Sequence, residues 1–233
     1  MENLFETVNL ENDIFDQPER ILIFGSSNAG KSYLLQNLVR KYHKRFYKIV
    51  ISGEPNELLH YPETKHITSH YKNENNPIYD PFVDFDPIEM KKHGDKQILT
   101  IYDDLLEFAV NSLTISNQFS RGRHKRISTI IILQNYFPNL TSKSFMPMLR
   151  NNSTIQIFCK MRSASEIMMI SRAIEFDKKT QQFFIDLIKN VVQNTKYAYI
   201  AVFLDESNSK LRYRSNLCSE DNTEYPTLYI NPQ

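Results

Sequence analysis

The sequence predicts an α/β fold in which a mainly parallel β-sheet is flanked by helices. Short apolar runs rich in β-branched residues recur along the chain, and segments of helical or loop character separate them. The first run leads into an octet that contains two glycines, and a stretch with helical spacing of apolar residues follows. With 233 residues, of which 41% are hydrophobic, the chain is long enough to bury one sizeable core.

The octet is a phosphate-binding loop. Residues 21–24 form an apolar run suited to a buried strand, and residues 25–32 match the pattern G-x-x-x-x-G-K-[ST]. The glycines allow a tight turn that brings backbone N–H groups against phosphate oxygens. Lys31 places a charge within reach of the β- and γ-phosphates, and the Ser32 hydroxyl is placed to ligate Mg²⁺. The candidate nucleotide-binding residues are Gly25, Ser26, Ser27, Asn28, Ala29, Gly30, Lys31, Ser32 and Tyr33.

A helix is expected directly after the loop. Its inner face is marked by apolar residues at helical spacing, Leu34, Leu35, Leu38, Val39 and Tyr42. A helix that begins at the loop points its N-terminus at the phosphates, and an ordinary turn would not need these flanks. The predicted cofactors are ATP and Mg²⁺, because the Asn-Lys-x-Asp motif with which GTPases read guanine does not occur in the sequence.

Four later segments read as further strands, residues 48–52, 97–102, 129–133 and 154–159. Between the first two of them, residues 53–96 hold several prolines and are expected to form a polar surface excursion with short helices.

The last third of the chain predicts two helices and a hairpin. A capping box at 163–166 opens a helix through Phe176, and Asp177 is placed to cap a second helix. Met168 and Met169 are expected in the core. A strand over 197–204 then pairs with 210–213 as a C-terminal β-hairpin, and the last dozen residues read as an arm or edge extension. We predict a single domain over 1–233, with its core at about 18–204, an N-terminal arm over 1–17 and a hairpin and tail over 205–233.

Two adjacent carboxylates end the strand of residues 97–102. Asp103 is the candidate metal ligand beside Ser32, and Asp104 is the candidate for orienting or deprotonating the attacking water. The neighbouring carboxylates repel each other unless a cation balances them, and Lys31 with Mg²⁺ would do so. The alternative is that either aspartate caps a helix that starts at Leu105.

Gln134 ends the strand of residues 129–133. In an open parallel sheet, ligands bind at the carboxyl ends of the strands, where an amide can contact the γ-phosphate or the attacking water. The alternative is a polar side chain that bonds only to backbone.

A basic segment precedes the same strand. Arg121 and Arg123 are the candidates for an arginine that a neighbouring subunit supplies to the transition state, with Arg126 and Arg150 in reserve. They belong to a window between Glu107 and Glu166 with eight basic and no acidic residues, whereas the rest of the chain has 20 basic and 27 acidic residues. This asymmetry indicates a surface that faces a polyanion, although a solvated face would also explain it.

Other chemistries are disfavoured. Cys159 and Cys218 are too few for a disulfide framework, which favours a reducing, intracellular setting. No signal peptide is visible and no apolar stretch approaches the ~20 residues of a membrane span. His66 and His70 would need a helix to share one face, and the residues between them form helices poorly, so we expect no zinc site.

Together these motifs resemble the FtsK–HerA superfamily of additional-strand, RecA-like P-loop NTPases. Within it, the chain is most similar to the genome-packaging ATPases of double-jelly-roll capsid viruses. The resemblance runs from Ile21 to about Ile174 and depends on residues 25–32, 98–104 and 121–134.

The resemblance implies that the strand of residues 129–133 lies between the loop strand and the strand of residues 97–102. It also implies an ATP hydrolase that works as a DNA translocase, packaging a viral double-stranded DNA genome into a preformed capsid. Such an enzyme forms a homo-oligomeric ring, a pentamer or hexamer, around duplex DNA, and a neighbour donates the arginine. Capsid vertex proteins are the implied partners, and the host-cell interior or the virion is the implied location.

Two other functions stay open at this stage. A P-loop kinase for a nucleoside or small metabolite would need an arginine lid and an acceptor pocket, and DNA would not stimulate it. A non-hydrolysing assembly protein would use ATP only to order its ring.

Overall fold

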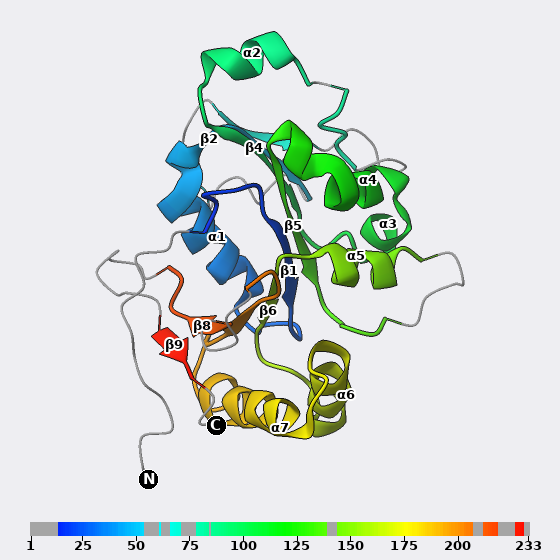
Figure 1. Ribbon diagram of the computed structural model, residues 1–233, viewed down its shortest axis with the longest axis vertical. Helices are drawn as coiled ribbons and strands as arrows, with labels where there is room; N and C mark the ends of the chain where they lie inside the picture. The colour runs from blue at the N-terminus through cyan, green and yellow to red at the C-terminus, as the bar shows by residue number, and fades with distance from the viewer. Residues whose placement is uncertain are drawn as a thin grey trace.

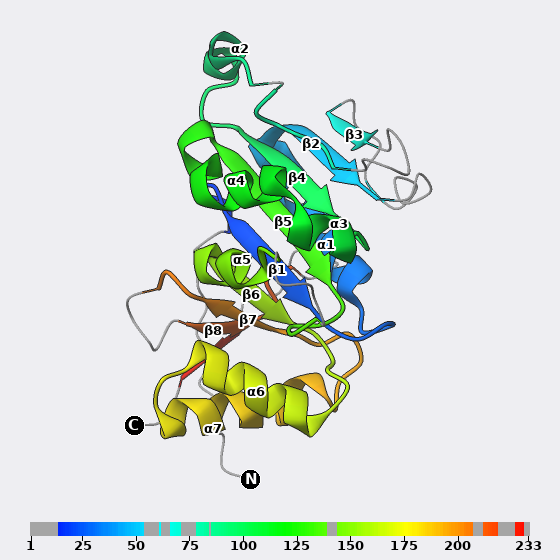
Figure 2. The same ribbon diagram turned by 90° about the vertical axis from the view of Figure 1, so that its right-hand side faces the viewer.

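The computed structural model describes residues 14–53, 61, 66–70, 78–83, 85–138, 144–206, 212–218 and 227–230. Within them, one sheet of nine strands is flanked by helices on both faces (Figure 1, Figure 2). The strands are β1 (Arg20–Phe24), β2 (Phe46–Ser52), β3 (Ile67–His70), β4 (Gln97–Tyr102), β5 (Ile127–Leu133), β6 (Ile155–Phe158), β7 (Ile200–Phe203), β8 (Tyr213–Ser215) and β9 (Thr227–Tyr229). The helices are α1 (Lys31–Tyr42), η1 (His43–Arg45), α2 (Pro87–Lys92), α3 (Leu106–Asn111), α4 (Leu113–Arg121), η3 (Gly122–Lys125), α5 (Met146–Asn152), α6 (Ala164–Ile174), α7 (Lys178–Leu187) and η4 (Ile188–Val192).

The strand order is β3-β2-β4-β5-β1-β6-β7-β8-β9. Every pair from β3 to β6 is parallel, and β6, β7, β8 and β9 pair antiparallel. β5 lies between the loop strand β1 and the Asp-Asp strand β4, as the resemblance implied. The predicted fold class, a mainly parallel P-loop NTPase sheet with an additional strand and a C-terminal hairpin, is confirmed.

Side-chain alternation along β1 explains the two layers of the core. Leu22 and Phe24 join the apolar cluster under α3 to α7, whereas Ile21 and Ile23 join the cluster under α1. Figure 1 shows α1 on one side of the sheet and α3, α4 and α5 on the other. Because both faces are covered, the central strands read as continuous apolar runs in the sequence.

The predicted caps of the last two long helices are confirmed. Ser163 Oγ accepts a hydrogen bond from Glu166 N at 3.2 Å, and Asp177 accepts from the backbone at the start of α7. Two details of α6 are wrong in the prediction. The helix ends at Ile174, before Phe176, because Glu175 is extended. The expected core residues Met168 and Met169 are 46% and 49% exposed, since α6 turns its isoleucines inward.

The hairpin differs from its prediction in its bounds. β7 pairs with β8 at Tyr213–Ser215, slightly later than the expected 210–213, and residues 207–211 lie outside the described part. β9 confirms the edge extension near the C-terminus. The excursion over 53–96 contains the expected short helix α2 but also β3, which extends the sheet and was not predicted.

The described end of the predicted N-terminal arm is part of the core. Ile14 and Phe15 are buried, and the Phe15 ring makes edge contacts with Tyr42 and Phe46 at 5.4 and 5.0 Å. The domain bounds themselves stay a prediction. In the described part of the chain, no helix combines the length and apolar character that crossing a membrane requires.

Candidate functional site

The phosphate loop joins β1 to α1 at the carboxyl edge of the parallel strands. Gly25 N donates to Leu133 O of β5 at 3.3 Å, and Ser26 N donates to Lys160 O, just after β6, at 2.9 Å. The loop is therefore tied to both strands that neighbour β1.

Both motif glycines are required by their surroundings. A Cβ on Gly25 would lie 2.8 Å from the Cβ of Cys159, and one on Gly30 would lie 2.7 Å from the ring of Tyr197. Gly30 also has φ of +87°, which L-residues rarely adopt, and Asn28 has φ of 61°. Any side chain at these glycines would displace the loop.

Lys31 curls back over the loop. Its Nζ donates to Gly25 O at 2.9 Å and Ser26 O at 2.8 Å. Burial lowers the pKa of Lys31, and Arg162 adds to the shift, while Asp103 opposes it. The ammonium thus lies at the loop, partly desolvated, where a phosphate oxygen would be a strong partner.

The two aspartates after β4 occupy different environments. Asp103 is buried, and its N donates to Ser52 O of the neighbouring strand at 3.1 Å. Burial and then the charge of Asp104 raise the pKa of Asp103 to about 6, and Lys31 opposes the shift. Asp104 is exposed and has φ of 50°. The helix-cap alternative is wrong, because α3 takes Leu105 as its N-cap and no side chain caps it.

Gln134 reaches the second aspartate across the sheet edge. Its Nε2 donates to Asp104 Oδ1 at 3.0 Å. The contact forms because β4 and β5 are parallel neighbours, so their carboxyl ends meet. The structure therefore brings Lys31, Asp103, Asp104 and Gln134 to one edge of the sheet.

The residues at this edge fit Mg²⁺. Ser32 is exposed in the first turn of α1, and its hydroxyl and the Asp103 carboxylate are the oxygen donors that the sequence predicted. In the described ranges, no three His, Cys, Asp or Glu side chains converge as a complete metal site. Beside a nucleotide, Mg²⁺ is usually bound through one or two carboxylates together with substrate phosphates and water.

The candidate arginines lie at the other edge. Arg121 ends α4 and Arg123 lies in η3, both before β5 begins, whereas the phosphate loop follows the end of the parallel strand β1. The seven residues of β5, at ~3.3 Å each, separate the two edges by about 23 Å. The structure does not bring these arginines to the loop of their own chain.

The reserve arginines are engaged within the chain. Arg126 donates to Gly94 O, and its Nη2 lies 3.5 Å from Asp95. Arg150 lies over the rings of Tyr136 and Phe137, with its Cζ 4.9 Å from each ring centroid. Arg121 and Arg123 are exposed.

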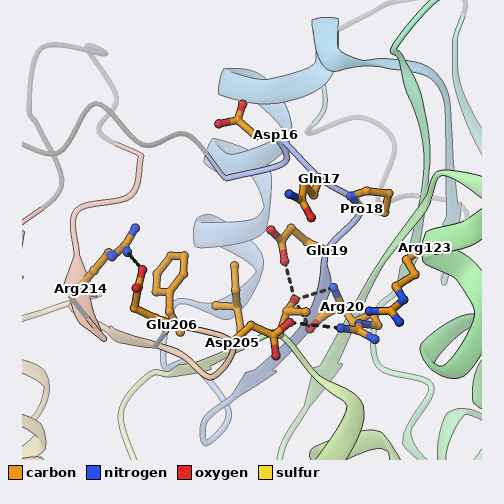
Figure 3. Close-up of a pocket in the computed structure, with 12 residues that line it drawn as sticks. Asp16, Gln17, Pro18, Glu19, Arg20, Arg123, Asp205, Glu206 and Arg214 are labelled. Atoms are coloured by element: carbon orange, nitrogen blue, oxygen red, sulfur yellow. Dashed lines mark hydrogen bonds and ion pairs between the residues drawn. The ribbon is translucent and has the colours of Figure 1, made fainter. Parts of the chain in front are cut away.

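Arg123 lines a polar pocket of about 460 Å³ at this amino edge (Figure 3). Arg20 is 9% exposed there, donates to Phe119 O at 3.3 Å and pairs with Asp205 at 3.4 Å. Burial lowers the pKa of Arg20, and the nearby charge of Arg123 adds to that effect. Arg20 was not predicted from the sequence, because a charged residue at the start of an apolar strand is usually exposed to solvent.

Comparison with known proteins identifies the family of the chain and proteins of similar fold. Residues 3–225 match the family described as Poxvirus A32 protein. The genome packaging NTPase B204 from Sulfolobus turreted icosahedral virus 2, solved with AMPPCP, has 16% identity and a TM-score of 0.56 over 80% of this chain and 93% of that chain. Its AMP complex gives a TM-score of 0.54 at 16% identity, over 81% and 93% of the two chains.

A conjugation coupling protein is also similar. The pCW3 protein TcpA, solved with ATPγS, has 13% identity and a TM-score of 0.52 over 88% of this chain and 64% of that chain. No curated protein sequence matched the chain. The predicted resemblance to the packaging branch of the P-loop ATPases is confirmed, and the chain belongs to the Poxvirus A32 protein family.

Proposed function

We propose that this protein hydrolyses ATP and uses the energy to move a viral double-stranded DNA genome into a preformed capsid. The observation that carries the proposal is the convergence of Lys31, Asp103 and the Asp104–Gln134 pair at one sheet edge. The family match, the fold shared with a protein described as a genome packaging NTPase, and the nucleotides in that protein's structures support it.

The phosphate side of the site follows from the loop. Backbone N–H groups of residues 25–32 and the Lys31 ammonium bind the β- and γ-phosphates. Ser32 and Asp103 would hold Mg²⁺, which would neutralise charge on the phosphates. Ionised Asp103 is disfavoured by burial beside Asp104, and this is the setting in which a carboxylate gains most from a cation.

The hydrolytic step falls to the exposed aspartate. Asp104 accepts a hydrogen bond from Gln134, which fixes its carboxylate and leaves oxygen lone pairs for the attacking water. Gln134 lies at the end of β5, where it can also respond to the γ-phosphate.

The arginines complete a neighbour's site. Arg121 or Arg123 reaches the nucleotide of the next subunit in a homo-oligomeric ring, since neither lies at the loop of its own chain. The remaining basic side chains of the window hold the DNA backbone without reading its sequence. Capsid vertex proteins are the partners, and packaging takes place inside the host cell.

The test is the ATPase rate of the assembled protein with and without duplex DNA, on samples sized by light scattering. We expect DNA to stimulate turnover, and Asp104→Asn to lower it by ~10²–10⁴-fold while ATP still binds. Asp186→Asn is the matched control, because Asp186 lies on α7 outside the site and its carboxylate, like that of Asp104, accepts a hydrogen bond from a glutamine, Gln182. If DNA does not change the ATPase rate of the assembled oligomer, the proposed DNA translocation is refuted. Full ATPase activity in Asp104→Asn would contradict the proposed role of Asp104 in the hydrolytic step.

A further inference from the structure

A cleft of about 360 Å³ adjoins the phosphate loop. Asn28 and Ala29 of the loop form one side, residues 193–197 form the other, and Lys160 lies at the same opening. The cleft shares loop residues with the phosphate site but contains none of the catalytic side chains. A ligand held by the loop would therefore extend directly into it.

Tyr197 is the aromatic wall of this cleft. Its side chain contacts Gly30 closely enough that a Cβ there would lie 2.7 Å away, and it is 45% exposed. The ring of Tyr33, in the first turn of α1, lies 5.3 Å from that of Tyr197 at 33°. Tyr33 follows Ser32 directly, so the aromatic pair lies immediately beside the phosphate-binding residues.

The backbone that presents Tyr197 has unusual geometry. Ile188–Val192 forms a π-helical turn, and Tyr197 has φ of 62°. π-turns and left-handed non-glycine residues are costly and gather at functional sites. Val192 is fully buried, and Gln193 Nε2 donates to Met161 O at 3.2 Å, so the segment is anchored at its start.

The lining chemistry includes a ring face that suits a planar base. The lining combines the two lysines Lys160 and Lys196 with amide and hydroxyl side chains and one aromatic ring, and the Lys196 ammonium lies 4.7 Å from the Tyr197 ring centroid. Lys196 is exposed on a flexible stem and can leave the ring face readily. A ring face beside a phosphate loop can stack on any planar base.

We propose that this cleft binds the purine base of the nucleotide, stacked against Tyr197 and supported by Tyr33. The inference rests on the proposed function, because it requires a nucleoside triphosphate in the loop. Stacking reads the π-face of a base rather than its hydrogen-bonding edge, so ATP and GTP should bind with similar affinity, and CTP should bind more weakly.

Calorimetric titration of the whole chain with ATP, GTP, CTP and inorganic tripolyphosphate tests the proposal. Tyr197→Asn removes the ring and suits a left-handed backbone, because asparagine is enriched there. We expect this variant to weaken ATP binding roughly tenfold and to leave tripolyphosphate binding unchanged. Tyr197→Phe should bind both as the wild type does. Phe176→Asn is the matched control, because the Phe176 side chain is fully exposed and does not line the cleft.

Each other result counts against a defined claim. Unchanged ATP affinity in Tyr197→Asn, or an equal loss for ATP and tripolyphosphate, would overturn the base site. If the wild type binds ATP much more tightly than GTP, the base is recognised through its hydrogen-bonding edge, and the proposed stacking mode is wrong. A wild type that binds neither ATP nor tripolyphosphate would overturn the proposed function together with this inference, whereas tripolyphosphate binding alone would overturn only the base site.

Discussion

Replacing Arg123 with alanine should disable the active site of a neighbouring subunit and leave its own intact. Arg123 precedes β5 and Gln134 follows it, so about 23 Å of strand separates them, far beyond the reach of one side chain. An arginine supplied to a phosphoryl-transfer site is worth ~10³–10⁵ in rate, so Arg123→Ala rings should be nearly inactive.

Mixing two inactive variants shows whether Arg123 contributes to the active site of its own subunit or to that of a neighbour. Lys31→Ala retains Arg123, and Arg123→Ala retains Lys31. In a ring assembled at random from equal amounts, one interface in four joins an intact Lys31 to an intact Arg123, so about a quarter of wild-type turnover should return. If Arg123 served its own subunit, no subunit in the mixture would hold both groups and turnover would stay near zero.

The assay is steady-state phosphate release from rings that are dissociated, mixed and reassembled, with differently tagged variants to show that subunits exchange. Arg121→Ala alone is the variant that decides between the two candidate arginines, since Arg121 is also exposed, at the end of the preceding helix. Exchanged rings without recovery would refute the placement of Arg123 in a neighbour's site. Inactivity of Arg121→Ala with full activity of Arg123→Ala would move the role to Arg121.

Two further predictions concern buried polar groups. Burial raises the pKa of Asp103 from 3.8 to about 6. The charged carboxylate therefore lowers the free energy of unfolding by up to ~3 kcal/mol, and this loss develops as the pH rises from 3.8 to about 6. Asp103→Asn should therefore raise the unfolding temperature measured by calorimetry by several degrees at pH 7.5, and by less at pH 5. The same variant should lose Mg²⁺-dependent turnover. An unchanged unfolding temperature at pH 7.5 would contradict this prediction. The fully buried Gln118 amide accepts from Thr100 at 2.8 Å and Thr129 at 3.1 Å and donates to Tyr102 at 2.7 Å. Gln118→Leu leaves these hydroxyls short of partners and should cost ~2–4 kcal/mol by urea unfolding, and a loss below ~1 kcal/mol would show that the network relaxes.

Local patterns predicted the sheet and the phosphate edge well. Residues 97–102 were expected as a strand and β4 has those bounds, because a strand buried on both faces is an uninterrupted apolar run. The loop and the aspartates are contiguous motifs, so their positions at strand ends follow once the strands are known. Gln134 was found for the same reason, since it ends the apolar run of β5.

The features that sequence reasoning missed depend on contacts between distant segments. Tyr197 touches Gly30 only after the chain has returned through β6 and α7, and its left-handed backbone delays the predicted strand to Ile200. Met168 and Met169 were expected inside because methionines in such helices usually pack in the core, and only the folded packing decides which side of α6 faces the sheet. No periodicity in the sequence carries that information.

The parallel topology itself divides the candidate catalytic groups between two edges. Parallel strands gather their carboxyl ends, so one subunit can assemble the loop, the aspartates and Gln134 at a single edge. By the same geometry, whatever precedes β5 must lie at the opposite edge, which is where Arg123 lines a pocket with buried Arg20. In the proposed ring, a head-to-tail contact would bring the amino edge of one copy to the carboxyl edge of the next, and such contacts close into a ring when the rotation between neighbours closes. The proposed need for a neighbour therefore follows from the parallel direction of the strands once Arg123 is assigned to a phosphate site, whatever the number of subunits in the ring.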